Sequence, residues 1–201
     1  MGSWKWFKIY KYKKTLILHP ECYTERYSLH RNMEYAGINE TKEKLLEKFE
    51  IIETKDPYKI FDDVWYLGQI HRKFDVPIKN LPTALKNGEV DYIYDDSGIA
   101  IKTENGIVVL GSCSHSGIDN IIEQAKKVTG INRVIAVIGG FHLKEINPYT
   151  EKIVQYFKQN QVQNAFMGHC TSNEVIDYFE KQLKDCTNVK RMFVGLVFEI
   201  N

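Results

Sequence analysis

Short apolar runs and helix-like segments alternate through the second half of the chain. Three runs of strand length each close on a histidine: IVVLGSCSH (107–115), VIAVIGGFH (134–142) and VQNAFMGH (162–169). A segment with helical spacing of its apolar residues follows each run, which predicts helices near 117–128, 148–159 and 173–184. A strand, a crossover helix and a parallel strand form a unit of about 30 residues, and these crossovers have one hand. The pattern therefore predicts an α/β fold with successive parallel strands in one sheet.

The first half of the chain has a less regular pattern. Residues 15–19 (TLILH) predict a buried strand that Pro20 ends, and Asn39 is a good N-cap for a helix through 41–50. The other expected elements are short strands at 50–53 and 64–70, a long connection over 72–95, a hairpin formed by 97–103 and 106–112, and a β-rich end at 191–200. The stretch from Ile107 to Thr171 is thus the part around which the rest is organised.

Aromatic residues and lysines interleave over residues 4–14 (WKWFKIYKYKK). One interpretation is a nucleic-acid surface, on which aromatics stack on bases and lysines neutralise phosphates. The other is a helix with one buried aromatic face and one solvated lysine face. The helix requires nothing beyond ordinary packing, so we favour it.

Composition narrows the class of protein. A chain of 201 residues predicts one domain, and 43% hydrophobic with 26% charged residues is typical of a globular protein. The net charge of +1 provides no basic footprint for nucleic acid over the whole chain. No apolar run approaches the ~20 residues of a membrane-spanning helix, and the basic N-terminal segment lacks the apolar core of a secretory signal. We expect a cytoplasmic protein that acts on a small molecule, with no nucleic-acid or membrane partner.

Three histidines follow the three predicted parallel strands at equal spacing. His115, His142 and His169 are separated by 27 residues in each case. Groups just past the ends of parallel strands gather at the edge where open α/β sheets bind ligands, and three imidazoles with a water form a catalytic zinc arrangement. Bound zinc lowers the pKa of that water to about 7. The alternative is that each histidine is a hydrogen-bonded turn residue and that the equal spacing is a coincidence.

Residues near these histidines add candidate chemistry. Cys113 and Cys170 each lie within two residues of one of them, so thiolate ligation is conceivable. A small buried residue at a strand end is the interpretation we favour. The four cysteines include no CxxC pair, which argues against a zinc knuckle or a disulfide scaffold. Ser116 is expected to cap a helix rather than bind phosphate, and the acids available to orient the imidazoles are Asp95, Asp96 and Glu145.

These motifs resemble a known family. DDSGIAIKTENGIVVLGSCSHSGIDN (95–120), AVIGGFHL (136–143) and GHCT (168–171) are similar to the C-terminal half of metallo-β-lactamase-fold metal-dependent hydrolases. LILHPECYTERYS (16–28) and VWYLGQIHRKFD (64–75) fit the branch named for a dihydropterin-linked ribofuranosyl-aminobenzene-phosphate synthase. The resemblance implies an αββα sandwich with a metal site at one edge of its sheets. In the family this site is dinuclear, and its metal would be zinc, or alternatively iron or manganese, with His115 and His169 at the positions of two ligand motifs. The equal spacing adds His142, so His115, His142 and His169 are the candidate ligands.

The chain also departs from the family pattern. His142 stands where many members have a metal-bridging aspartate, and the family's HxHxDH motif is absent from the sequence. Relative to the family, residues 1–201 therefore resemble one metallo-β-lactamase-like domain that lacks much of its N-terminal half. A homodimer, or a partner chain that supplies the missing part, is one consequence that we expect.

Two functions remain open from the sequence. The first is a metal-dependent hydrolase that uses a metal-bound hydroxide on a substrate that the sequence does not identify. The second is a non-catalytic or degenerate relative that binds a metal or a phosphorylated ligand, or that acts through oligomeric contacts, because large exposed apolar patches mark interaction sites.

Overall fold

The computed structural model describes residues 13–78, 81–197 and 199. A seven-stranded sheet forms most of the molecule, with the strand order β11-β10-β9-β8-β7-β5-β4. Strands β8 to β11 run parallel, whereas β7, β5 and β4 pair antiparallel. The strands of this sheet are β4 (Tyr58–Phe61), β5 (Val64–Tyr66), β7 (Gly98–Thr103), β8 (Gly106–Gly111), β9 (Val134–Gly139), β10 (Asn164–Met167) and β11 (Asn188–Arg191).

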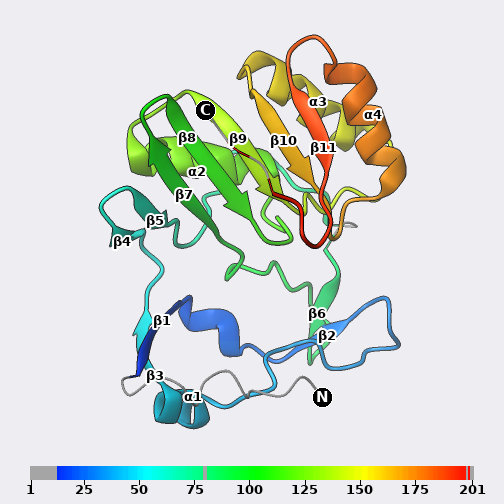
Figure 1. Cartoon of the computed structure of the whole chain (residues 1–201). Coiled ribbons are helices and arrows are strands. Elements are labelled where there is room, and N and C mark those ends of the chain that lie inside the picture. The colour runs from blue at the N-terminus through cyan, green and yellow to red at the C-terminus, as the bar shows by residue number, and fades with distance from the viewer. Residues whose placement is uncertain (1–12, 79–80, 198, 200–201) are drawn as a thin grey trace.

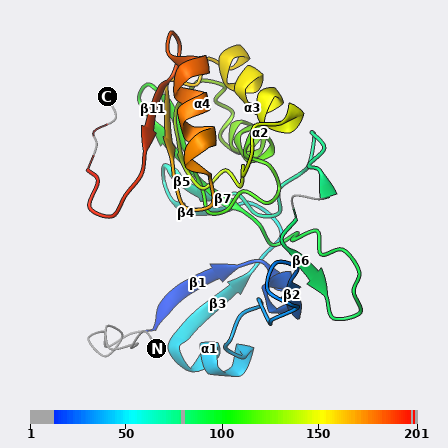
Figure 2. The same cartoon turned by 90° about the vertical axis from the view of Figure 1, so that its right-hand side faces the viewer.

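Three helices cover one face of this sheet (Figure 2). They are α2 (Ile118–Thr129), α3 (Pro148–Gln159) and α4 (Asn173–Leu183). Strand β8 alternates as a half-buried sheet requires, because Ile107 and Val109 join the main core while Val108 joins a smaller cluster with Ala136 and Phe166. The predicted parallel strand–helix units are therefore confirmed.

The remaining strands form two small sheets that lie below the large sheet in Figure 1. Strand β1 (Lys14–Leu18) pairs in parallel with β3 (Phe49–Glu53), and β2 (Arg26–Ser28) pairs antiparallel with β6 (Thr83–Leu85). A 3-10 helix, η2 (Pro20–Tyr23), and the helix α1 (Lys42–Lys48) connect them. We call β1, η2, β2, α1, β3 and β6 together the N-terminal lobe.

An ion-pair network ties the N-terminal lobe to the loop that enters β7. Arg26 makes a bidentate contact with Asp95 at 2.7 and 2.9 Å, and its Nε lies 3.1 Å from Asp91. These side chains are largely buried, and Asp91 also accepts a hydrogen bond from Thr83 in β6. One guanidinium therefore holds β2, β6 and the 91–95 loop in a fixed relation.

Three local predictions were wrong, and a fourth lies outside the described residues. Ser116 does not cap α2, because the N-cap of that helix is Gly117 and no side chain caps it. Thr41, rather than Asn39, is the N-cap of α1, because its hydroxyl accepts from the backbone N–H of Lys44. In the described part of the predicted β-rich end, residues 191–197 and 199, only Arg191 lies in a strand, β11 (Asn188–Arg191). The chain then turns at Gly195, whose φ is +89°. Of the helix predicted over 4–14, residues 4–12 are not described, and Lys14 begins β1. Among the described residues, every helix is too short or too polar to cross a membrane.

Candidate metal centre

The three predicted histidines stand just past the ends of three neighbouring parallel strands. His115 follows β8, His142 follows β9 and His169 follows β10. Because β8, β9 and β10 are parallel, their loops lie at one edge of the sheet. His115 and His142 are half-buried and His169 is exposed.

The loop after β9 fixes His142 by burying both of its neighbours. Phe141 is 2% exposed and Leu143 is 1% exposed. The Phe141 ring packs against Phe157 and Phe179 of α3 and α4, while its backbone N–H donates to the hydroxyl of Thr171 at 2.9 Å. His142 itself has a φ of +51°, a left-handed conformation that is uncommon for a residue with a side chain and that clusters at functional sites.

The loop after β8 holds His115 in a similar way. Ser114 and Ser116 on either side are each 2% exposed. The Ser114 hydroxyl donates to the carbonyl of Gly140 at 2.7 Å, and the Ser116 N–H donates to the Asp96 carboxylate at 2.8 Å. Burial raises the pKa of Asp96, while the hydrogen bonds from the Ser116 and His115 backbone oppose that rise. Of the acids considered from the sequence, Asp96 therefore contacts a histidine loop, whereas Asp95 is engaged by Arg26.

Two glycines let the three loops approach one another. A Cβ on Gly139 would lie 2.0 Å from the carbonyl oxygen of Gly111, and a Cβ on Gly140 would lie 2.6 Å from the sulfur of Cys170. Without these Cβ atoms the backbones come close enough for the Gly140 N–H to donate to the carbonyl of Ser112 at 3.0 Å. The Gly-Gly pair at the end of β9 thus allows the loops of β8 and β10 to meet across it.

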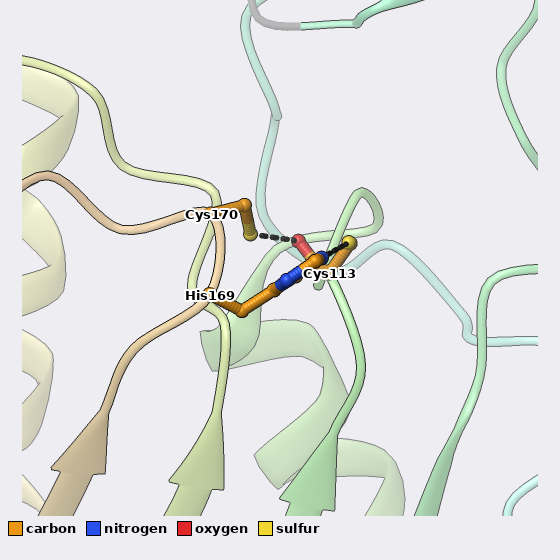
Figure 3. A group of neighbouring side chains, drawn as sticks. All are labelled: Cys113, His169 and Cys170. Atoms are coloured by element: carbon orange, nitrogen blue, oxygen red, sulfur yellow. Dashed lines mark hydrogen bonds between the residues drawn. The ribbon is translucent and has the colours of Figure 1, made fainter. Parts of the chain in front are cut away.

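The structure groups the candidate ligands differently from the prediction. The rings of His115 and His142 are in edge-to-face contact, with centroids 4.6 Å apart. His169 instead places its Nε2 3.0 Å from the sulfur of Cys113. Within the described part of the chain, one group of three side chains has its potential metal-binding atoms all within 4.8 Å of one another. The group consists of Cys113, His169 and Cys170 (Figure 3).

Cys113 contacts His169 and is also influenced by His115, the partner of His142. Hydrogen bonding from the Cys170 thiol and from the His115 imidazole lowers the pKa of Cys113 well below that of an ordinary thiol, with a further contribution from the charge of His169. The same contact raises the pKa of Cys170. The expectation that both cysteines are buried strand-end residues was therefore wrong, because both are half-buried. Cys113 contacts His169, and Cys170 contacts the Cys113 carbonyl.

The donor atoms at this edge fit a divalent metal ion. Imidazole nitrogens and thiolate sulfurs are the ligands that zinc prefers, in sets of three or four. A cavity of about 220 Å³ opens beside His142 and is lined also by His30 and Lys144. His30 comes from the N-terminal lobe and was not a sequence candidate, because its position at the site depends on how that lobe folds back.

A cationic side chain lies beside the first histidine loop. The guanidinium of Arg72 is 5.5 Å from the ring centroid of Tyr94 and 6.0 Å from that of Tyr92. It donates to the Tyr92 carbonyl and lies 3.5 Å from the Ser116 hydroxyl. Residues 72–95 were predicted only as a long connection, so the sequence pattern did not reveal that Arg72 lies beside the His115 loop.

Another cavity lies away from these loops, against α3. It measures about 830 Å³ and is lined by Asp119, Tyr149 and Tyr156 among others. Asp119 is 5% exposed, and burial raises its pKa to about 6. This cavity contains none of the three histidines, so it is not part of the candidate metal centre.

Comparison with known proteins agrees with the fold and extends it. No protein-family model matches the chain. The sequence is 30% identical over 196 residues to 7,8-dihydropterin-6-methyl-4-(β-D-ribofuranosyl)-aminobenzene-5'-phosphate synthase of Methanocaldococcus jannaschii, which covers 92% of this chain and 65% of the relative. An uncharacterised protein of the same archaeon is 35% identical over 160 residues, which covers 78% of this chain and 58% of that protein.

A solved structure gives the same result. The chain superposes with a TM-score of 0.79 and 27% identity on the crystal structure of a metal-dependent hydrolase of the β-lactamase superfamily, over 94% of this chain and 72% of that chain. The chain therefore has the fold of the metallo-β-lactamase superfamily. Its sequence is similar to that of the dihydropterin-linked synthase, and it spans 65% of that enzyme's length. The predicted fold class and the resemblance to this family are confirmed.

Proposed function

We propose that this chain carries the metal centre of a metal-dependent hydrolase, with His115, His142 and His169 among the ligands. The observation that carries the proposal is the delivery of three imidazoles to one sheet edge, with the His115 and His142 rings 4.6 Å apart. The structural relative is a metal-dependent hydrolase, which supports the same reaction class. A bound divalent ion, for which zinc is our first candidate, would lower the pKa of a coordinated water and so supply a nucleophile at neutral pH.

The residues of this chain prepare that site in three ways. Buried neighbours on both sides hold His115 and His142, so the imidazoles are positioned before any ligand binds. Asp96 fixes the loop of His115 through the Ser116 N–H. Arg72, stacked beside Tyr94, offers a guanidinium that can pair with an anionic group of the substrate.

We propose a phosphate-bearing small molecule as the substrate. Arg72 lies within 3.5 Å of the Ser116 hydroxyl, and guanidinium groups are suited to bidentate phosphate recognition. The name of the sequence relative describes a product with a 5'-phosphate, which supports the same substrate class.

Association with a second copy or with a partner chain stays a prediction, and light scattering is its test.

The test is metal content together with hydrolysis of a panel of phosphoesters, thioesters and lactones. We expect zinc-loaded wild type to bind at least one ion and to turn over a member of the panel. His142→Ala should lose both properties, while His71→Ala, at an exposed histidine outside the three loops, should keep both. Full metal binding and hydrolysis in the His142→Ala variant would contradict the proposal.

A further inference from the structure

The cysteines beside the histidines form a donor set of their own. The sulfurs of Cys113 and Cys170 and a ring nitrogen of His169 all lie within 4.8 Å of one another. Nε2 of His169 is 3.0 Å from the Cys113 sulfur, and the Cys170 thiol donates to the Cys113 carbonyl at 3.6 Å. Figure 3 shows the three side chains converging between the loops that follow β8 and β10.

The backbone holds these donors together across 56 residues of sequence. Gly140 leaves the space that the Cys170 sulfur occupies, since a Cβ there would lie 2.6 Å from that sulfur. On the same loops, Gly168 donates its N–H to the carbonyl of Gly139, and Thr171 donates its N–H to Gly168. The β10 loop is therefore tied to the end of β9, and the Gly140 N–H, which donates to the Ser112 carbonyl, ties the end of β9 to the β8 loop. Neither link uses the three donor side chains.

The chemistry of the set favours a thiophilic ion. Two thiolates and one imidazole are a recognised ligand combination for zinc, and three protein ligands leave a coordination position open. A site of imidazoles alone does not discriminate in this way, because imidazole suits zinc, iron, nickel and copper, whereas thiolates select zinc and other soft ions. His169 is exposed and both cysteines are half-buried, so an ion can reach the donors from solvent.

We propose that Cys113 and Cys170 are metal ligands and that, with His169, they bind Zn²⁺ through two sulfurs and one nitrogen. The inference rests on the proposed function for the presence of a metal at this edge. It adds that the ion near His169 is held by thiolates, which the three-histidine site does not include.

The test is a titration with Co²⁺, a spectroscopic stand-in for zinc, under reducing conditions. Wild type should develop the near-ultraviolet charge-transfer absorption of thiolate–Co²⁺ bonds. Cys113→Ser and Cys170→Ser should each lose about half of that absorption, and each should weaken zinc binding by about tenfold or more, the scale expected for altering a metal site. Cys186→Ser, which changes an exposed cysteine outside the site, should behave as wild type.

A second measurement needs no variant. Excess Zn²⁺ should protect Cys113 and Cys170 of the wild-type protein from alkylation, as read by peptide mass, and should leave Cys186 reactive. Bound Co²⁺ without charge-transfer absorption, or zinc-loaded protein with unprotected thiols, would overturn the thiolate assignment and leave the proposed function standing. A folded protein that binds neither ion would overturn both.

Discussion

The seven-stranded sheet and the N-terminal lobe differ in what holds them together. Residues of β8, β9 and β10 are buried nearly throughout, and helices cover one face of the sheet. In β1, β2 and β3 no residue is fully buried. The buried apolar residues of the lobe lie elsewhere, at Leu45 in α1 and Ala84 in β6, and its least exposed ion pairs are those of Arg26. The metal-binding candidates Cys113, His115, His142 and His169 all follow strands of the sheet, where packing fixes their positions.

Removing core volume beneath the site should have the largest effect. Phe157 is fully buried and its ring contacts those of Phe141 and Phe179. Phe157→Ala is expected to lower the free energy of unfolding by about 4 kcal/mol, measured by urea denaturation. Phe61→Ala, at a 70% exposed phenylalanine of β4, should change it by less than about 0.5 kcal/mol. Equal effects of the two substitutions would mean that the sheet core does not carry the stability.

Breaking the charged network should loosen the lobe and leave the sheet intact. Arg26→Ala strands two largely buried carboxylates, Asp91 and Asp95, at a cost of about 3 kcal/mol. Hydrogen exchange should then show faster exchange of the β2 and β6 amides with unchanged protection in β9. Lys86→Ala, which removes the exposed pair with Glu25, is expected to cost less than about 1 kcal/mol. Loss of protection in β9 would contradict this separation of the two regions.

The smallest expected effect is a pH dependence set by Asp119. Because burial raises its folded pKa from 3.8 to about 6, the native state binds the proton more tightly than the unfolded state. Stability should therefore fall as the pH rises from about 4 to about 6, by no more than about 3 kcal/mol in total. Asp119→Asn should melt at a higher temperature than wild type at pH 8 and show no such advantage at pH 4. A wild-type advantage at pH 8 would show that the carboxylate is stabilised in the fold.

The regular part of the fold could be predicted because local pattern and tertiary packing agree there. The runs ending at His115, His142 and His169 carry strand residues that both core clusters use. The pattern of apolar residues failed to predict the structure where the backbone conformation of a single residue determines the path of the chain. Gly195, with φ of +89°, turns a chain segment whose apolar composition indicated a strand. Val194 and Val197 are fully or nearly fully exposed, so no packing offsets that turn.

The composition of the site could be predicted only in part, for a geometric reason. Equal spacing of the histidines indicates which strand ends carry them, but it does not say which side chains touch. The contact of Cys113 with His169 depends on β8 and β10 loops that meet across the end of β9. The signal was present as the Gly139–Gly140 pair, since glycines at a strand end indicate close backbone approach. Arg72 gave no such signal, because its place depends on a loop with little regular structure.

The central claim is that the ends of β8, β9 and β10 form a metal centre. Anomalous diffraction at the zinc absorption edge, from crystals of zinc-loaded wild-type protein, tests it most directly. We predict a zinc peak at this edge, within bonding distance of His169 and of at least one of the two sulfurs of Cys113 and Cys170. Zinc peaks only at other positions, with no ion bound to His115, His142 or His169, would contradict this claim.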